Sequence, residues 1–168
     1  MNPDELFLEA YEQFAGAIFR HCFFRLNASR EEALDLTQET FFHAWRYMSS
    51  GREIKNVRAF LYKIATNLII DRIRKKKSLS LDSLKEIGFD PENVNVPESA
   101  EFKTEINQLK FLMKDLKPKD RELLVMRFGE DMSIPEIAVI LDESENNISV
   151  RLHRAIKKLQ EIFNDGKK

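Results

Sequence analysis

The cationic side chains that could bind a polyanion recur at helical spacing near the end of the chain, in residues 133–159. Ser133 with Glu136 three residues later is typical of a helix start, because each side chain can cap a backbone N–H group of the other residue. A polar turn, Asp142-Glu143-Ser144, separates this helix from a second one. The second helix has an apolar side and a basic side, and its cations are Arg151, Arg154, Lys157 and Lys158.

This arrangement predicts a helix-turn-helix, which would place its second helix in the major groove of DNA. The apolar residues of the second helix should face the first helix; they are Ile148, Leu152, Ala155, Ile156 and Leu159. Ala138 in the first helix is small enough to let the two helices cross closely. The alternative is an amphipathic bundle helix whose basic face is merely solvated.

The residue types that perform catalysis or bind metals are scattered. His21, His43 and His153 lack the spacing to other ligands that a metal site needs. The chain has no glycine-rich phosphate loop, nucleophile elbow or H-E-x-x-H motif. We therefore expect no enzyme, no cofactor and no metal. Cys22 is the only cysteine, and the sequence shows neither a signal peptide nor a membrane span, so we expect a cytoplasmic protein.

The formal net charge of −1 conceals a strong segregation of charge along the chain. Residues 1–39 hold three Arg or Lys against eight Asp or Glu, whereas residues 46–77 hold ten against two. Residues 78–100 are acidic again, with one Lys against five acids. Such blocks indicate different partners for different surfaces, and residues 46–77 are the expected contact to a polyanion.

The pattern of apolar residues predicts an all-α fold made of two small helical domains joined by a flexible linker. The chain has only five glycines and five prolines, mostly at the ends of segments. We expect helices over residues 3–25, 29–48, 56–77, 101–116 and 118–129, followed by the two helices described above. The domains would be 1–77 and 101–168, and the acidic linker 78–100. Phe41, Trp45 and Met48 share one face of the second helix, which predicts that they lie in the core.

Three stretches, in this order, resemble the extracytoplasmic-function (ECF) sigma factors, the minimal promoter-specificity subunits of bacterial RNA polymerase. DLTQETFFHAW (35–45) resembles sigma region 2.2, and VRAFLYKIATNLIIDRIRKKK (57–77) resembles regions 2.3 and 2.4. LKPKDRELLVMRFGEDMSIPEIA, continuing to LHRAIKKL (116–159), resembles region 4. The resemblance covers nearly the whole chain and implies a sigma region 2-like bundle followed by a sigma region 4-like helix-turn-helix.

The resemblance implies that region 2.2 binds the coiled coil of the polymerase β′ subunit. The matching positions are Asp35, Gln38 and Glu39, with Phe41 or Phe42 as apolar anchors. Acids and an amide would suit a basic face of the partner. The alternative is a helix whose acids only complement its own dipole, which explains Glu31 and Glu32 better than Glu39.

Regions 2.3 and 2.4 of the family engage the −10 promoter element, where the strands separate and a base is flipped into a pocket. That task needs stacking, base-edge contacts and a cationic path. The implied residues are Arg52, Lys55, Asn56, Arg58, Tyr62, Lys63, Asn67, Arg72, Arg74, Lys75 and Lys76. In the alternative interpretation, Asn67 is a structural amide, and the basic residues from Arg72 onward are only a solvated helix end. For Tyr62 a structural role is the favoured interpretation.

Region 4 of the family reads the −35 element. The implied residues are Asn146, Asn147, Ser149, Val150, Arg151, His153, Arg154 and Lys157. The chain departs from the family pattern here: Asp142-Glu143 replaces a glycine and an apolar residue, Asn146-Asn147 replaces Gly-Thr, and Ser149 replaces a cation. Two amides in place of a cation predict a different −35 sequence, richer in adenine contacts.

The implied partners are core RNA polymerase, through its β′ and β subunits, and promoter DNA, with an anti-sigma factor as a further candidate. We expect no membrane association and a monomer when the protein is free. The acidic linker would tether the two DNA-reading domains and thread a polymerase channel, or it would be a plain spacer. The competing function is a dimeric helix-turn-helix regulator that binds a palindrome and is not a polymerase subunit.

Overall fold

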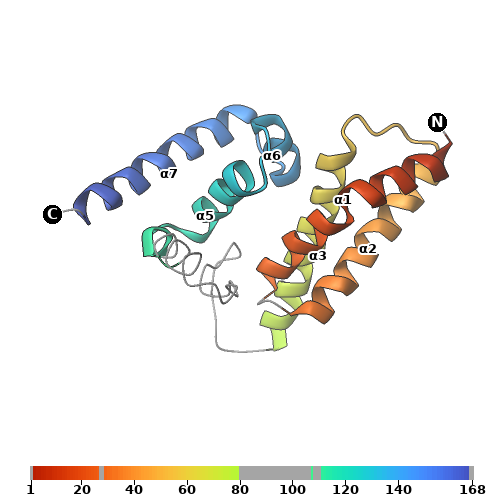
Figure 1. Ribbon diagram of the computed structural model, residues 1–168, viewed down its shortest axis with the longest axis horizontal. Coiled ribbons are helices and arrows are strands. Elements are labelled where there is room, and N and C mark those ends of the chain that lie inside the picture. The colour runs from red at the N-terminus through yellow and green to blue at the C-terminus, as the bar shows by residue number, and fades with distance from the viewer. Residues whose placement is uncertain (1, 27–28, 80–106, 108–110, 167–168) are drawn as a thin grey trace. The chain divides into compact units, whose positions relative to one another are not determined.

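The computed structural model describes residues 2–26, 29–79, 107 and 111–166 (Figure 1). Within these ranges the regular secondary structure is helical and contains no strand. The chain divides into two units, and each is described by itself. The all-α, two-domain fold predicted from the sequence is confirmed.

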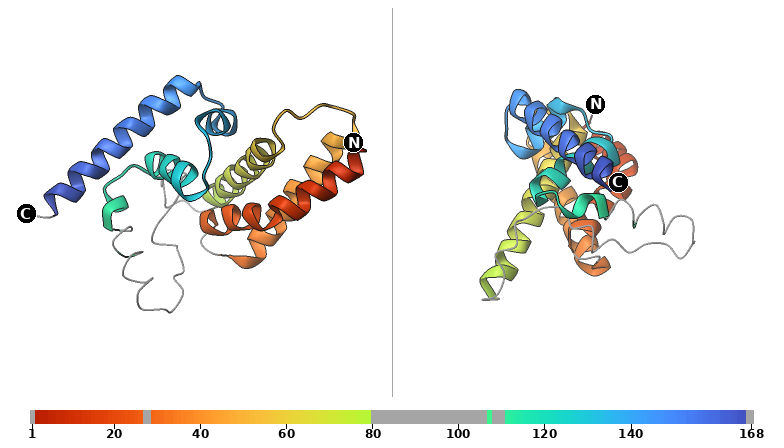
Figure 2. Two further views of the ribbon diagram at one scale, coloured as in Figure 1. Left: turned by 45° about the horizontal axis from the view of Figure 1, so that its top comes forward. Right: turned by 90° about the vertical axis from the view of Figure 1, so that its left-hand side faces the viewer.

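The first unit consists of three helices that pack side by side (Figures 1 and 2). They are α1 (Pro3–Arg25), α2 (Arg30–Ser49) and α3 (Val57–Leu79), and each contacts the other two. The shared core is almost fully shielded from solvent and includes Ile18, Cys22, Ala33, Leu36, Ala44, Leu61 and Ala65. The small residues of this core let three helices approach closely, and they leave the long charged side chains on the outside.

Each helix of this unit begins at a polar cap that the sequence contains. Asn2 and Glu5 form a capping box at the start of α1, and the Ser29 hydroxyl accepts the Glu32 N–H at the start of α2. Asn56 caps α3, because its Oδ1 accepts the Ala59 N–H at 2.9 Å. The three starts agree with the predicted helices. α3 ends at Leu79, two residues inside the predicted linker, and the rest of that linker lies outside the described residues.

Two aromatic residues of the first unit differ from their sequence-based assignments. Trp45 is 41% exposed, while Phe41 and Met48 are buried as predicted. The buried arc of α2 is centred on Ala33 and Ala44, and Trp45 lies just beyond its edge. Tyr62, one of the residues implied for −10 DNA, is 3% exposed and packs edge-on against the His21 ring. Tyr62 is therefore a core residue, as the structural interpretation held.

The second unit contains a short helix, a wider helical turn and the two helices of the predicted helix-turn-helix. They are α5 (Pro118–Leu124), the π-helical turn η2 (Val125–Gly129), α6 (Ile134–Leu141) and α7 (Glu145–Asp165). The sequence predicted one regular helix over 118–129; its last turn instead widens, and the Glu130 N–H bonds to the Val125 carbonyl at 2.9 Å. α7 continues to Asp165, past the last residue of the predicted motif, Leu159 (Figure 2). The predicted helix over 101–116 lies largely outside the described residues.

The first helix of the helix-turn-helix has the cap that the sequence predicted, and the second helix begins at a further cap in the turn. Ser133 and Glu136 form a capping box at the start of α6, and the Ser144 hydroxyl accepts the Asn147 N–H at the start of α7. Between the helices, Asp142 adopts a left-handed conformation with φ of 58°, which lets the Glu143 N–H bond back to the Ala138 carbonyl. Ile137, Ile148, Leu152 and Ala155 are buried in this unit. The turn thus fixes where α7 begins and which of its sides is exposed.

Candidate nucleic-acid and partner interfaces

α2 presents acids and exposed apolar rings on the same side. Asp35 and Gln38 are exposed and Glu39 is partly exposed, as a contact surface requires. Exposed apolar side chains accompany them on this helix: Leu34, Phe42 and Trp45 are 43%, 55% and 41% exposed. A large exposed apolar surface rimmed by polar groups is typical of a protein-binding site.

Of the two predicted apolar anchors, only Phe42 can present its ring to a partner. Phe41 is 3% exposed and packs edge-on against Phe7 and Tyr11 of α1. The Phe42 ring lies roughly parallel to that of Trp45, with centroids 6.5 Å apart, and the Arg46 guanidinium lies over it. Because Trp45 was expected in the core, the sequence analysis missed it as a surface residue.

Two ion pairs join the acidic side of α2 to the basic end of α3. The Arg72 guanidinium donates to Asp35 at 2.8 Å, and the Lys76 ammonium lies 2.7 Å from a Glu32 carboxylate oxygen. The hydrogen bond from Arg72 to Asp35 is the main cause that raises the pKa of Arg72. Residues predicted for two different partners, Asp35 for polymerase and Arg72 for DNA, therefore pair with each other in the isolated chain.

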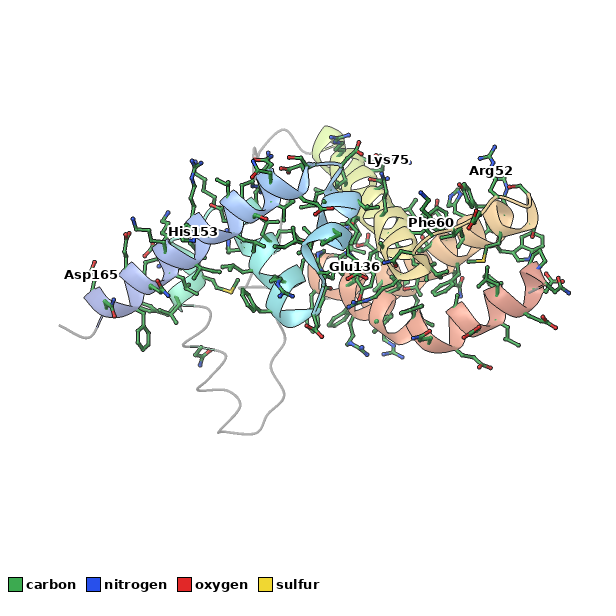
Figure 3. All side chains as sticks on the ribbon, turned by 90° about the horizontal axis from the view of Figure 1, so that it is seen from above. Arg52, Phe60, Lys75, Glu136, His153 and Asp165 are labelled. Atoms are coloured by element: carbon green, nitrogen blue, oxygen red, sulfur yellow. The ribbon has the colours of Figure 1, made fainter. Side chains whose placement is uncertain are left out.

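Three other predicted −10 residues of α3 lie on a different side of the helix from Arg72. Lys63, Asn67 and Arg74 are spaced so that one helical face carries all three. Asn67 and Arg74 are exposed and Lys63 is half-buried. Lys75 extends the charge toward the C-terminal end of α3, where Figure 3 labels it, whereas Lys76 pairs with Glu32 of α2. This face can follow a DNA backbone while Asn67 offers an amide to a base edge.

A cation and two aromatic rings pack in series beside the loop between α2 and α3. Gly51 has a φ of 74°, a conformation that glycine adopts without strain, and it turns the chain sharply after α2. The Arg52 guanidinium lies 5.3 Å from the centre of the Tyr47 ring, and that ring lies 4.7 Å from Phe60 at the start of α3. Figure 3 labels Arg52 and Phe60, the first and the last of these three side chains. The sequence analysis missed Tyr47 and Phe60; aromatic residues flanking a basic loop were the available signal.

The other predicted residues of the loop region have mixed positions. Lys55 is exposed and unobstructed for a phosphate contact. Asn56 is exposed as well, but its side-chain oxygen already caps α3. Arg58 is half-buried, with its guanidinium over the Tyr62 ring at 5.8 Å. Of these three residues, Lys55 fits the predicted contact best.

α7 exposes most of the predicted −35 residues along one side. These exposed residues are Asn146, Asn147, Val150, His153, Arg154 and Lys157. Figure 3 labels His153 midway along α7 and Asp165 at its end. Ser149 is half-buried, and its hydroxyl donates to the Glu145 carbonyl of its own helix at 2.8 Å. Amides and cations on one exposed helical face match the donor and acceptor chemistry of major-groove base edges.

Arg151 is tied to the body of the second unit. Its Nη1 donates to Glu143 Oε1 at 2.5 Å, and its Nη2 donates to the Lys119 carbonyl at 3.4 Å. The other oxygen of Glu143 accepts a hydrogen bond from the Asn147 amide. Arg151 thus links α7 to the turn and to Lys119 of α5. Glu143 was noted in the sequence only as a departure from the family pattern.

The described ranges show neither a metal centre nor a membrane-spanning helix. No group of three His, Cys, Asp or Glu side chains in them could hold a metal ion. None of the helices in the part of the chain that the structure describes is both long and apolar enough to span a bilayer. His21, which lies in the core, instead shares a hydrogen bond with the Thr66 hydroxyl at 3.1 Å.

Comparison with known proteins assigns both units to one family. Residues 10–79 match the family model for Sigma-70 region 2, and residues 106–159 match that for Sigma-70, region 4. The chain is 28% identical to the ECF RNA polymerase sigma factor SigW of Bacillus subtilis, over 98% of this chain and 92% of that protein. It is also 28% identical to SigM of the same organism, over 94% and 95% of the two chains.

Two solved structures have the same fold. The sigma factor RpoE, in complex with the anti-sigma factor NepR from Bartonella quintana, matches with a TM-score of 0.69 at 22% identity, over 94% of this chain and 96% of that one. CnrH, in complex with the cytosolic domain of CnrY, matches with a TM-score of 0.61 at 20% identity, over 96% and 90%.

Proposed function

Because the chain belongs to the ECF sigma factors of the sigma-70 family, we propose that it binds core RNA polymerase, recognises −35 and −10 promoter elements and promotes strand opening. In this proposal residues 1–77 bind polymerase and the −10 element, residues 101–168 bind the −35 element, and residues 78–100 tether the two. The role is regulatory, not enzymatic.

The observation that carries this proposal is the presence of two chemically different surfaces on the first three-helix unit. The exposed acids and rings of α2 suit a protein partner, and the row of Lys63, Asn67 and Arg74 on α3 suits a nucleic acid. A sigma factor must hold polymerase and DNA at once, so both surfaces are required on one unit. An ordinary helix-turn-helix regulator needs only its DNA-binding helix and a dimer interface.

We further propose an anti-sigma factor as a regulatory partner. The fold neighbour RpoE was solved in complex with the anti-sigma factor NepR. An inhibitor of this kind would cover the surfaces of α2 and α7 that polymerase and DNA otherwise use. In this proposal the chain acts in the cytoplasm, and the free protein would be a monomer.

The test is binding of the full chain to purified bacterial core RNA polymerase, followed by transcription from a promoter library. We expect Asp35→Ala with Gln38→Ala to weaken polymerase binding about ten-fold or more, because both side chains are exposed on the acidic side of α2. Asn67→Ala should leave polymerase binding intact and lower the yield of open complexes about ten-fold, the effect of one lost base contact.

Arg72→Ala is the matched control, because it removes the Asp35–Arg72 pair while leaving the Asp35 carboxylate for polymerase. We expect it to bind polymerase as the wild type does. Equal loss of polymerase binding in the Asp35 and Asn67 variants would refute this division of labour. No binding to polymerase, together with a dimer that prefers a palindrome, would establish the regulator instead.

A further inference from the structure

Three residues at the start of α7 form a connected polar network centred on Glu143. One Glu143 oxygen accepts from the Asn147 amide nitrogen, and the other accepts from Arg151. The Glu143 and Arg151 side chains are only 27% and 21% exposed. Glu143 directly precedes the helix cap Ser144, where the positive end of the helix dipole stabilises a carboxylate. The carboxylate is thus held in place from three directions.

A carboxylate can only accept hydrogen bonds, so it determines which way the Asn147 amide faces. The Nδ2 group must point toward Glu143, and the carbonyl oxygen Oδ1 must point away from it. If the amide turned over, two oxygens would face each other. The backbone of Asn147 is fixed as well, because its N–H donates to the Ser144 hydroxyl at 3.2 Å. The amide therefore has one orientation while its residue remains exposed.

We infer that Glu143 is a positioning residue that locks the Asn147 amide and thereby sets a preference for adenine over guanine in the −35 element. The inference rests on the proposed function. The locked amide has Oδ1 and one remaining N–H to offer. Adenine presents an amino donor and the N7 acceptor in the major groove, which match these two groups. Guanine presents two acceptors, O6 and N7, and the fixed Oδ1 would meet one of them without a hydrogen bond.

Arg151 makes this arrangement compatible with DNA. An unpaired carboxylate at the start of the recognition helix would repel phosphates, and the guanidinium of Arg151 offsets its charge. The same guanidinium also donates to the Lys119 carbonyl, so the network is anchored outside α7. Glu143 and Asn147 are both departures from the family pattern, and the contact between them shows that they act as a pair.

The test is transcription by core polymerase with the full chain from templates randomised through the −35 element. Asn147→Ala identifies the base position that Asn147 reads. At that position we expect the wild type to favour adenine over guanine about ten-fold, and Glu143→Val to reduce this to less than about three-fold with other positions unchanged. Glu143→Gln should weaken the preference as well, because its single Oε1 cannot accept from both Arg151 and Asn147, and its Nε2 group can only donate to the Asn147 side chain.

The double variant distinguishes positioning from a general structural effect. Once Asn147 is alanine, Glu143→Val should change nothing further at that position. Glu145→Gln is the charge control, because it removes an acid from the same helix start and lies outside the network. If it relaxed the adenine preference as much as Glu143→Val does, the effect would be one of charge and the inference would fail.

A second measurement examines the fixed orientation of the Asn147 amide without polymerase. In NMR spectra of the full chain, one Asn147 side-chain amide proton should exchange with solvent at least several-fold more slowly than those of Asn146, and Glu143→Val should abolish this protection. Equal fast exchange in the wild type would overturn the lock. An adenine preference that survives Glu143→Val would overturn the inference and leave the proposed function standing. A wild type without any −35 selection would overturn both.

Discussion

The two units each contain an acid–arginine pair, and the two pairs differ in how firmly they are held. In the first unit, Asp35 and Arg72 are 61% and 28% exposed, and the pair joins two helices with the acid largely exposed. In the second unit, Glu143 and Arg151 are 27% and 21% exposed, and each makes a further hydrogen bond, to Asn147 and to the Lys119 carbonyl. The same two chemical groups therefore serve different purposes.

An exposed ion pair contributes only about 0–1 kcal/mol, so either member can exchange its partner for another at little cost. Asp35 can leave Arg72 when a basic protein surface arrives, and Arg72 is then available to a phosphate. A partly buried pair with additional hydrogen bonds cannot be exchanged in this way, because each group that lost its partner would stay poorly solvated. The first pair suits a contact surface, and the second suits a scaffold.

Among the variants that test this comparison, Arg151→Ala should lower the free energy of unfolding the most. The change leaves the Glu143 carboxylate without its cation and the Lys119 carbonyl without a donor. We expect the free energy of unfolding of the second unit to fall by about 1.5–3 kcal/mol, the range for hydrogen bonds to charged groups. Urea denaturation followed by circular dichroism measures it.

Arg154→Ala is the matched control for that variant, since Arg154 lies on the exposed side of the same helix. We expect it to change the free energy of unfolding by less than about 0.5 kcal/mol. If both variants lost the same stability, Arg151 would be a surface cation like its neighbour. The claim that the Glu143–Arg151 pair is held more firmly than the Asp35–Arg72 pair would then be wrong.

The contrast also shows which features sequence patterns can predict. The helix caps Asn2, Ser29 and Ser133 are local signals, so the helix starts were predicted to within a residue or two. The exposure of Trp45 was not predicted, because it depends on which part of α2 is covered by α1 and α3. The sequence of α2 alone does not contain that information.

The same reasoning explains the candidate sites. The resemblance to the family placed the basic residues of α3 and α7 on the correct helices, because the motifs are contiguous in the sequence. The resemblance could not show that Arg72 pairs with Asp35 across 37 positions, or that Arg151 is held by the turn and by residue 119. Contacts between separate elements decide whether a cation is available to DNA, and the motif alone carries no information about them.

A smaller effect is expected for Arg72→Ala, and its dependence on salt sharpens the comparison. The free energy of unfolding of the first unit should fall by less than about 1 kcal/mol at low salt, because the pair is largely exposed. At about 1 M NaCl the Debye length is about 3 Å, so this loss should nearly vanish. Thermal unfolding at the two salt concentrations measures the difference.

Arg74→Ala is the control, because Arg74 is exposed on another side of α3. It should be close to neutral at both salt concentrations. The loss in Arg151→Ala should persist in high salt, since its hydrogen bonds are partly shielded from solvent. A loss in Arg72→Ala that is as large and as insensitive to salt would make the two pairs equivalent and would remove the argument that Asp35 is exchangeable.

The smallest effect is expected for Asp142→Gly, which changes the turn that presents Glu143 and leaves the pair itself intact. Asp142 has a φ of 58°, a conformation that costs a non-glycine residue about 1 kcal/mol or more. Glycine removes that strain and adds a similar amount of entropy to the unfolded chain, so the free energy of unfolding should change by only a few tenths of a kcal/mol. Asp142→Val, which cannot adopt the conformation easily, should destabilise the second unit by about 1–2 kcal/mol.

The same two variants show how the turn acts on the Glu143–Arg151 pair. If the glycine variant kept the Asn147 amide protected from exchange while the valine variant lost this protection, the turn would act on the pair through backbone geometry alone. Loss of protection in both would mean that the Asp142 side chain also helps to hold Glu143 in place.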